Sequence, residues 1–252
     1  MLAVVGWHAR GYRKLWRGTI TVSFLNPIFF LLSIGVLLGS LVDRRNPDLS
    51  GLSYLEFVAP ALLATTAMQT ASSQTTYPIL VGLKWLRTYH AVVATPVRVG
   101  ELVAGVLAWA GVRVGLAVAV FALVAGVGGA FASPLAALAP LAALLCGLAF
   151  AAAIGAFTSS LEDDQALPAL FRFGLIPLFL FSGTFFPIDR LPDWLEPVAW
   201  ATPLWHGVEL CRDLAAARVE LLPDAGHVLY LVTLGAVGAV LTMRSCARRL
   251  GG

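Results

Sequence analysis

Long apolar stretches separated by short polar segments follow one another along the whole chain. Each stretch is close to the ~20 residues that a helix needs to cross a hydrocarbon core of about 30 Å. The stretches cover residues 20–41, 57–80, 102–126, 134–157, 168–187 and 227–243. This pattern predicts about six transmembrane helices. The composition agrees, since 59% of the residues are hydrophobic and only 12% are charged, about half the charged share of soluble domains.

The sequence therefore predicts an all-α integral membrane protein with one transmembrane domain over residues 1–252. With the N-terminus inside, the predicted cytoplasmic segments hold most of the Lys and Arg, and the outer segments hold most of the carboxylates. Because basic residues in short loops favour the cytoplasmic side, we expect both termini there. The net charge of +3 then reflects flanks that face anionic lipid rather than a nucleic-acid surface. One acidic loop, with Glu162, Asp163 and Asp164, departs from this pattern.

Residues 1–18 have the pattern of an amphipathic helix at the membrane interface. Four basic residues recur at helical spacing on one face, namely Arg10, Arg13, Lys14 and Arg17. Val4 and Tyr12 are among the residues of the opposite, apolar face. We expect this helix to lie along the inner leaflet. It either anchors the topology only or also docks a cytoplasmic partner.

The second predicted span is unusually polar in its inner half, "TTAMQTASSQTTYP". Such side chains are tolerated in a membrane when they face other helices or a wet cavity. They either form hydrogen bonds between helices or line a path for a polar or amphiphilic substrate. The candidates for the path are Thr66, Gln69, Thr70, Ser73 and Gln74.

Arg113 lies near the middle of the third predicted span. It follows Glu101 by twelve residues, about 18 Å along a helix, so it is expected to face protein or a cavity. One account pairs it with Ser, Thr or backbone carbonyls of a neighbouring span. The other makes it part of the translocation path, as a site for the anionic headgroup of a lipid-like substrate.

Two segments resemble the membrane subunits of ABC-2 type exporters. They are "RTYHAVVATPV", residues 87–97, and "FLFSGTFFPIDRLPDWL", residues 179–195. Within that group the chain is most similar to the permeases of nodulation-factor export and of daunorubicin resistance. The likeness implies an exporter that moves an amphiphilic drug, lipid or glycolipid out of the cytoplasm across a bacterial inner membrane.

The resemblance also implies partners and site residues. An ABC ATPase subunit, in two copies and carrying the ATP and Mg, is expected to dock on a cytoplasmic coupling segment, residues 84–98, beside a second permease subunit. The coupling residues are Lys84, Trp85, Leu86, Arg87, Thr88 and Tyr89, with Glu162, Asp163 and Asp164 as a second contact. After the fifth span, a re-entrant helical hairpin is expected over residues 183–222. Gly183 and Pro187 mark its bend, and Phe185 and Phe186 form an apolar plug at an outer gate.

Several other chemistries lack their motifs. The only lysines are Lys14 and Lys84, and neither lies in a G-x-x-x-x-G-K-[ST] loop, so this chain is expected to be non-catalytic, with no cofactor or metal of its own. An ion-coupled carrier is disfavoured because every Asp and Glu falls in a loop or at the edge of a span. A lipid-modifying enzyme would need more ligands than the Asp163–Asp164 pair. Cys146 is expected within a span, Cys211 outside the membrane and Cys246 inside. No disulfide is therefore expected.

Overall fold

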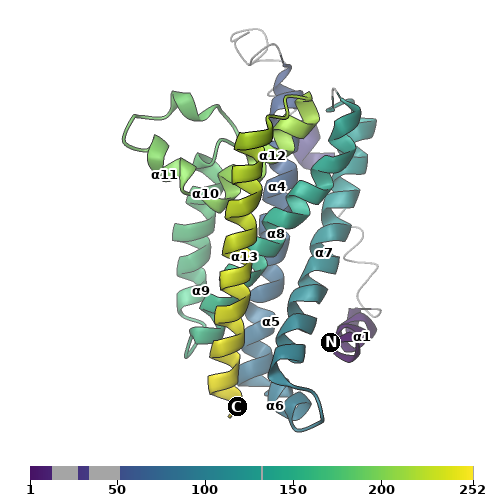
Figure 1. Cartoon of the computed structure of the whole chain (residues 1–252), viewed down its shortest axis with the longest axis vertical. Coiled ribbons are helices and arrows are strands. Elements are labelled where there is room, and N and C mark those ends of the chain that lie inside the picture. The colour runs from purple at the N-terminus through teal and green to yellow at the C-terminus, as the bar shows by residue number, and fades with distance from the viewer. Residues whose placement is uncertain (13–27, 34–51, 132, 252) are drawn as a thin grey trace.

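Helices make up all the regular structure of the described residues, which are 1–12, 28–33, 52–131 and 133–251 of the computed structural model. Four of them form an elongated bundle, in which α4 (Tyr54–Thr75), α7 (Val99–Val127), α8 (Ala139–Ser160) and α13 (Leu221–Leu250) run side by side (Figure 1). Both termini lie in its lower half, where α1 (Leu2–Tyr12) crosses α7 and is seen nearly end-on.

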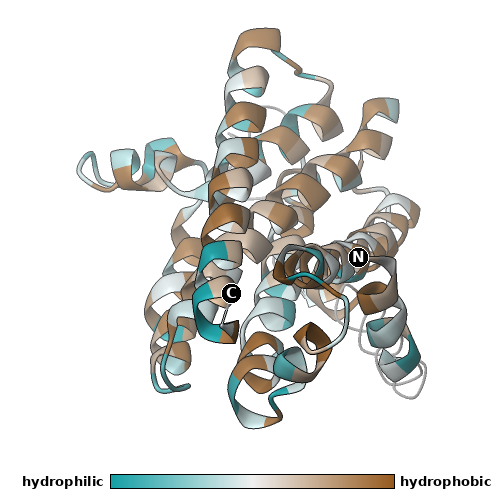
Figure 2. Cartoon of the chain, turned by 60° about the horizontal axis from the view of Figure 1, so that its bottom comes forward, coloured by the Kyte–Doolittle hydropathy of each residue, from teal (hydrophilic) through white to brown (hydrophobic). Residues whose placement is uncertain are grey.

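Shorter elements connect and cap the long helices. They are α5 (Tyr77–Leu80), η2 (Val81–Trp85), α6 (Thr88–Val93), η3 (Pro134–Leu138), α9 (Ala166–Ala169), η4 (Leu170–Leu175), α10 (Ile176–Phe181), η5 (Ile188–Arg190), α11 (Glu196–Trp200) and α12 (Pro203–Ala216). We call the end of the bundle with η2, α6 and the C-terminus the α6 end. The opposite end, with α11 and α12, is the α12 end. Figure 2 brings the lower end forward and shows hydrophilic residues gathered on the last turns of α13.

Three helical segments of the described chain are long and apolar enough to cross a membrane. They are Val99–Val127, Pro134–Ser160 and Leu221–Leu250, and they coincide with the third, fourth and sixth predicted spans. The first predicted span lies outside the described residues except for 28–33, which are helical. The total of six spans and the cytoplasmic placement of the termini stay predictions.

The second predicted span, residues 57–80, is not one continuous helix. Helix α4 begins at Tyr54, one residue after Ser53, which forms a capping box with Glu56. It ends at Thr76, whose ψ of −103° lies outside the helical region. Pro78, at the start of α5, explains the break, because its ring lacks an N–H and clashes with the carbonyl four residues earlier.

The helix that corresponds to the fifth predicted span, residues 168–187, ends six residues before the predicted boundary. It covers Ala166–Phe181 and contains a π-helical stretch, η4. That stretch precedes Pro177, which removes a helical N–H donor. The chain then turns at Gly183, with a φ of +75°. Residues 182–186, which include Ser182 and Thr184 as well as two phenylalanines, therefore form a turn and not the end of a membrane helix.

Cys211 is also placed differently from the prediction. It is fully buried in the same core cluster as Cys146, because α12 packs into the bundle against α4, α8 and α13. All three cysteines are free. The predicted separation of Cys146 from Cys211 is therefore wrong, since the two lie in one buried cluster.

Close helix crossings depend on glycines that leave room for a neighbouring backbone. A Cβ on Gly238 of α13 would lie 2.7 Å from the carbonyl carbon of Ala152 in α8. At the same crossing the Thr242 hydroxyl donates to the Ala152 carbonyl at 3.2 Å, and the Ser245 hydroxyl donates to the Ser159 carbonyl at 2.9 Å. Small and hydroxyl residues of this kind are typical of helix pairs in membranes.

We predict that Gly238→Ala separates α13 from α8 and lowers thermal stability, because backbone atoms cannot move aside as a side chain can. Thermal unfolding of the purified protein should show a loss of several degrees, as expected for about 1–3 kcal/mol of overpacking. Gly226→Ala is the matched control in the same helix, since its Cβ would meet nothing within 4 Å. Equal unfolding temperatures for both variants would contradict the close crossing.

Candidate functional site

The polar residues of α4 divide into a buried and an uncovered set. Thr65, Ser72, Thr75 and Thr76 are buried, whereas Thr66, Gln69, Thr70, Ser73 and Gln74 are half-buried or exposed. The uncovered residues recur at positions i, i+3, i+4, i+7 and i+8, which is one face of a helix. We call these five residues the polar stripe. They are the same residues that the sequence nominated for a path.

Hydrogen bonds between helices do not explain the hydroxyl groups of α4. Those of Thr65, Ser72 and Thr75 each donate to the backbone carbonyl four residues earlier, at 2.7–3.0 Å. The stripe residue Thr66 does the same toward Leu62 at 2.8 Å. This α4 backbone bonding satisfies the hydroxyls within their own helix. For these four hydroxyls the first of the two accounts, hydrogen bonds between helices, does not hold within the single chain.

Arg113 has a partner that neither sequence account named. Its guanidinium carbon lies 4.3 Å from the centre of the Tyr12 ring in α1. Trp109, one turn earlier in α7, contacts the rings of both Tyr12 and His8. An aromatic face is a favourable place for a guanidinium away from water. In α1, Val4 is buried and Arg10 is exposed as expected, while Arg13, Lys14 and Arg17 lie outside the described residues.

The two predicted coupling segments meet at the α6 end. Glu162 accepts from the Lys84 ammonium at 3.2 Å and from the Arg249 guanidinium at 2.9 Å, so it joins η2 to the end of α13. These contacts, first the hydrogen bond from Lys84 and then the charge of Arg249, lower the pKa of Glu162. Asp163 accepts from the backbone N–H of Gln165, and Asp164 is half-buried.

The surface next to this junction is formed by only part of the predicted coupling set. Trp85 and Leu86 are 55% and 70% exposed. Arg87 is exposed with a φ of +50°, and Thr88 starts α6. Tyr89 is buried instead, because its ring packs over Gly82, where a Cβ would lie 2.4 Å from it. Trp85, Leu86 and Arg87, which we call the coupling surface, are therefore the exposed residues of the first predicted segment, and Glu162 and Asp163 are the exposed residues of the second.

At the α12 end the two predicted plug residues point into different clusters. The Phe185 ring packs edge-on against Phe179, with ring centres 4.8 Å apart. Phe186 packs against the separate cluster of Ile188 and Leu191. The two rings therefore do not form a single apolar plug. The expected bend is present, since Gly183 has the positive φ that favours glycine, and Pro187 precedes η5.

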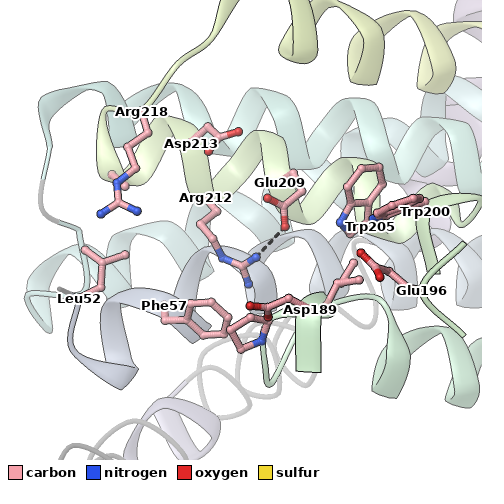
Figure 3. A pocket seen from close by; sticks show the side chains of 13 residues that line it. Leu52, Phe57, Asp189, Glu196, Trp200, Trp205, Glu209, Arg212, Asp213 and Arg218 are labelled. Carbon is pink, nitrogen blue, oxygen red and sulfur yellow. Dashed lines mark hydrogen bonds and ion pairs between the residues drawn. The ribbon is translucent and has the colours of Figure 1, made fainter. Parts of the chain in front are cut away.

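Arg212 holds this turn in place, and the sequence analysis missed it. Its guanidinium donates to Glu209 at 2.7 Å and to the carbonyl of Gly183 at 2.8 Å, and it lies 4.0 Å from the centre of the Phe57 ring (Figure 3). The side chain is only 12% exposed. The spacing of Glu209 and Arg212, at i and i+3 in the amphipathic segment 203–216, was the available signal.

Comparison with known proteins assigns the chain to a family. Residues 8–215 match the model of the ABC-2 type transporter family. The chain belongs to the ABC-2 type transporter family. It is 29% identical over 241 residues to nodulation protein J of Rhizobium meliloti (strain 1021), covering 95% of this chain and 89% of that protein.

Two further relatives support the assignment. Nodulation protein J of Rhizobium leguminosarum bv. trifolii is 32% identical over 227 residues, which are 86% of this chain and 84% of that protein. The inner membrane transport permease YadH of Escherichia coli (strain K12) is 22% identical over 200 residues, 77% of this chain and 73% of its own. The ABC-2 chain is therefore a membrane transport component.

Two pairs of titratable groups join α12 to α13 in this ABC-2 chain. The Nδ1 atoms of His206 and His227 are 2.6 Å apart, so one ring donates and the other accepts. Burial and the neighbouring His227 lower the pKa of His206 to about 4. Burial, then Glu209 and Asp224, raise the pKa of Asp213 to about 7, against the lowering effect of Arg212.

We predict that Asp213→Asn stabilises the ABC-2 chain more at pH 8 than at pH 5, because pH 5 lies only partly into the range in which the acid loses its contribution. A carboxyl group whose pKa is raised on folding contributes most below its unfolded pKa, and this contribution is lost as the pH rises through about 7. The amide resembles the protonated acid, so the variant should unfold a few degrees higher at pH 8. Asp193→Asn, at an exposed position, is the control. If the unfolding temperatures of the variant and the unaltered chain differ by the same amount at pH 5 and pH 8, the raised pKa of Asp213 is contradicted.

Proposed function

We propose that the protein is the permease subunit of an ATP-driven ABC exporter that moves an amphiphilic substrate out of the cytoplasm. Membership of the ABC-2 family and the likeness to proteins named nodulation protein J and inner membrane transport permease support this proposal. On the same ground we place the chain in a bacterial inner membrane. The observation that carries the proposal is the uncovered polar stripe of α4, residues 66–74.

Exposing the polar stripe to lipid would cost more free energy than exposing an apolar helix surface. Gln69 and Ser73 are exposed in the single chain, although most of the rest of α4 is buried by α7, α8 and α12. Amide and hydroxyl groups within a membrane face a bundle interior or a wet cavity. A second permease subunit set against this face, either a copy of this chain or a related one, would turn the stripe into one wall of a path. The substrate would exchange hydrogen bonds with it while crossing.

ATP hydrolysis would come from a separate ATPase subunit, which holds the ATP and Mg. The coupling surface offers an exposed indole, an apolar side chain and a cation, a composition suited to a protein partner. Glu162 links η2, next to this surface, to the C-terminal end of α13. A displacement of the coupling surface would therefore be transmitted both to α13 and, through η2 and α5, to α4.

We predict that Trp85→Ala weakens binding of the ATPase subunit and lowers export at least about tenfold, as expected for losing an aromatic anchor worth ~1.4 kcal/mol or more. Co-purification of the cognate ATPase subunit, and transport by the reconstituted pair, are the two measurements. Trp194→Ala removes a tryptophan that is 74% exposed at the opposite end of the bundle and should change neither. Full association and export by the Trp85 variant would remove the coupling surface from the interface.

The path is tested by making the polar stripe apolar. Gln69→Leu combined with Ser73→Leu should leave the fold and ATPase binding unchanged but reduce export about tenfold or more, since the substrate loses its hydrogen-bonding wall. Ser72→Ala changes a buried hydroxyl that bonds to its own helix, so it should retain export. Cysteines placed at 69 or 73 should cross-link two permease subunits. Normal export by the double variant, with no cross-linking, would contradict a path along this face.

A further inference from the structure

A cavity of about 370 Å³ opens at the α12 end, between the start of α4, the turn before η5, α11 and α12. Its volume is within the range of small-ligand sites, about 300–1,000 Å³. Figure 3 shows Trp200, Trp205 and Glu196 gathered at one side, with Asp189 beside Arg212 in the centre. Neither the proposed path nor the coupling surface includes this cavity.

Both arginines that line the cavity already have interaction partners. Arg212 donates to Glu209 and to the Gly183 carbonyl and covers the face of Phe57, so its charge is held within the wall. Arg218 is engaged as well. An anionic ligand would have to displace one of these contacts.

The negative charges are in excess. Four acidic side chains line the cavity, namely Asp189, Glu196, Glu209 and Asp213, against two arginines. The raised pKa of Asp213 makes its charge partial at neutral pH, so the excess rests on the other three. Glu209 pairs with Arg212, whereas Asp189 and Glu196 make no ion pair or side-chain hydrogen bond within the described part of the chain. No three acidic, histidine or cysteine groups among the described residues are arranged to hold a metal ion. The two unpaired carboxylates thus favour a single positive charge over a metal.

The aromatic wall favours a cation with an organic body. The rings of Trp200 and Trp205 lie 6.5 Å apart and tilted by 44°, and Trp200 is 47% exposed. Indole faces attract ammonium groups, and the attraction adds to that of nearby carboxylates. Trp205 is held by edge contacts with His206 and His227, which fixes this side of the wall.

We propose that this cavity is a binding site for organic ammonium ions, with the cation held between Trp200, Trp205 and the carboxylates of Asp189 and Glu196. The ligand class is an amine or quaternary ammonium carried on an apolar body. The site belongs to the single chain and concerns binding alone, so it does not rest on the proposed export function. Its ligand enters at the α12 end without contacting the polar stripe.

The test is equilibrium binding to the full purified chain in nanodiscs of neutral lipid. The probes are benzyltrimethylammonium, its neutral carbon analogue neopentylbenzene, and benzenesulfonate as an anion of similar size. Isothermal titration and tryptophan fluorescence should show saturable binding of the ammonium only. Glu196→Gln combined with Asp189→Asn, and separately Trp200→Leu, should each weaken it about tenfold or more.

The neighbouring segment supplies matched controls. Asp193→Asn and Trp194→Leu change an acid and a tryptophan that are exposed but do not line the cavity, and they should keep the affinity of the unaltered chain. Asp189 and Trp200 are themselves exposed, so their variants are expected to fold. Absence of saturable ammonium binding would overturn the proposal. Equal binding of the neutral or anionic probe, or equal weakening by the control variants, would overturn it too.

Discussion

The close approach of α8 to its neighbours is the constraint on which the other features depend. A Cβ on Gly147 of α8 would lie 2.6 Å from Val114 of α7, and one on Gly207 of α12 would lie 2.5 Å from Cys146 of α8. With the Gly238 crossing, these contacts bring three helices against α8. In a membrane, apolar side chains gain little by leaving lipid, so close packing of small residues has to provide the attraction. This packing sets which face of α4 is covered and which is left uncovered.

The α12 end shows how a polar group stabilises a turn that has little other support. The Gly183 carbonyl would be left without a partner in a poorly hydrated place, and Arg212 supplies a donor from another element. Arg212 in turn needs Glu209 and the Phe57 face to keep its charge at low exposure. Arg212 thus links α12 to the turn after α10 through the Gly183 carbonyl and to the start of α4 through the Phe57 ring. The cavity beside it exists because these three elements are held apart at fixed positions.

The sequence predicted the elements that depend on local length and composition. The third, fourth and sixth apolar stretches became span-length helices because nothing within them interrupts the helical pattern. The boundaries failed where one residue decides the outcome, as with Pro78 after α4 and Gly183 after α10. Hydropathy averages over such single residues.

The site was harder to predict because contacts between helices decide which of its residues are exposed and which partners they have. The polar residues of α4 look equivalent in the sequence, and only the positions of α7, α8 and α12 separate the buried hydroxyls from the polar stripe. Arg113 could not be paired with Tyr12, since no pattern says where α1 crosses α7. Phe185 and Phe186 look like one apolar tip, yet adjacent residues in a turn point in different directions. Arg212 and the His206–His227 pair likewise depend on contacts between elements.

Helix α4 connects the α12 end of the molecule to the α6 end. Its first turns carry Phe57 beneath Arg212, and the chain that leaves its last turn reaches Lys84 and the Glu162 junction. Between them the helix is interrupted at Thr76, whose ψ of −103° lies outside the helical region. The part above the break is buried on most sides and cannot shift without repacking α8, whereas the part below it carries the exposed Trp85 and Leu86. Movement at the α6 end is therefore absorbed first at Thr76, and it reaches the polar stripe only as a rotation or shift of the whole of α4.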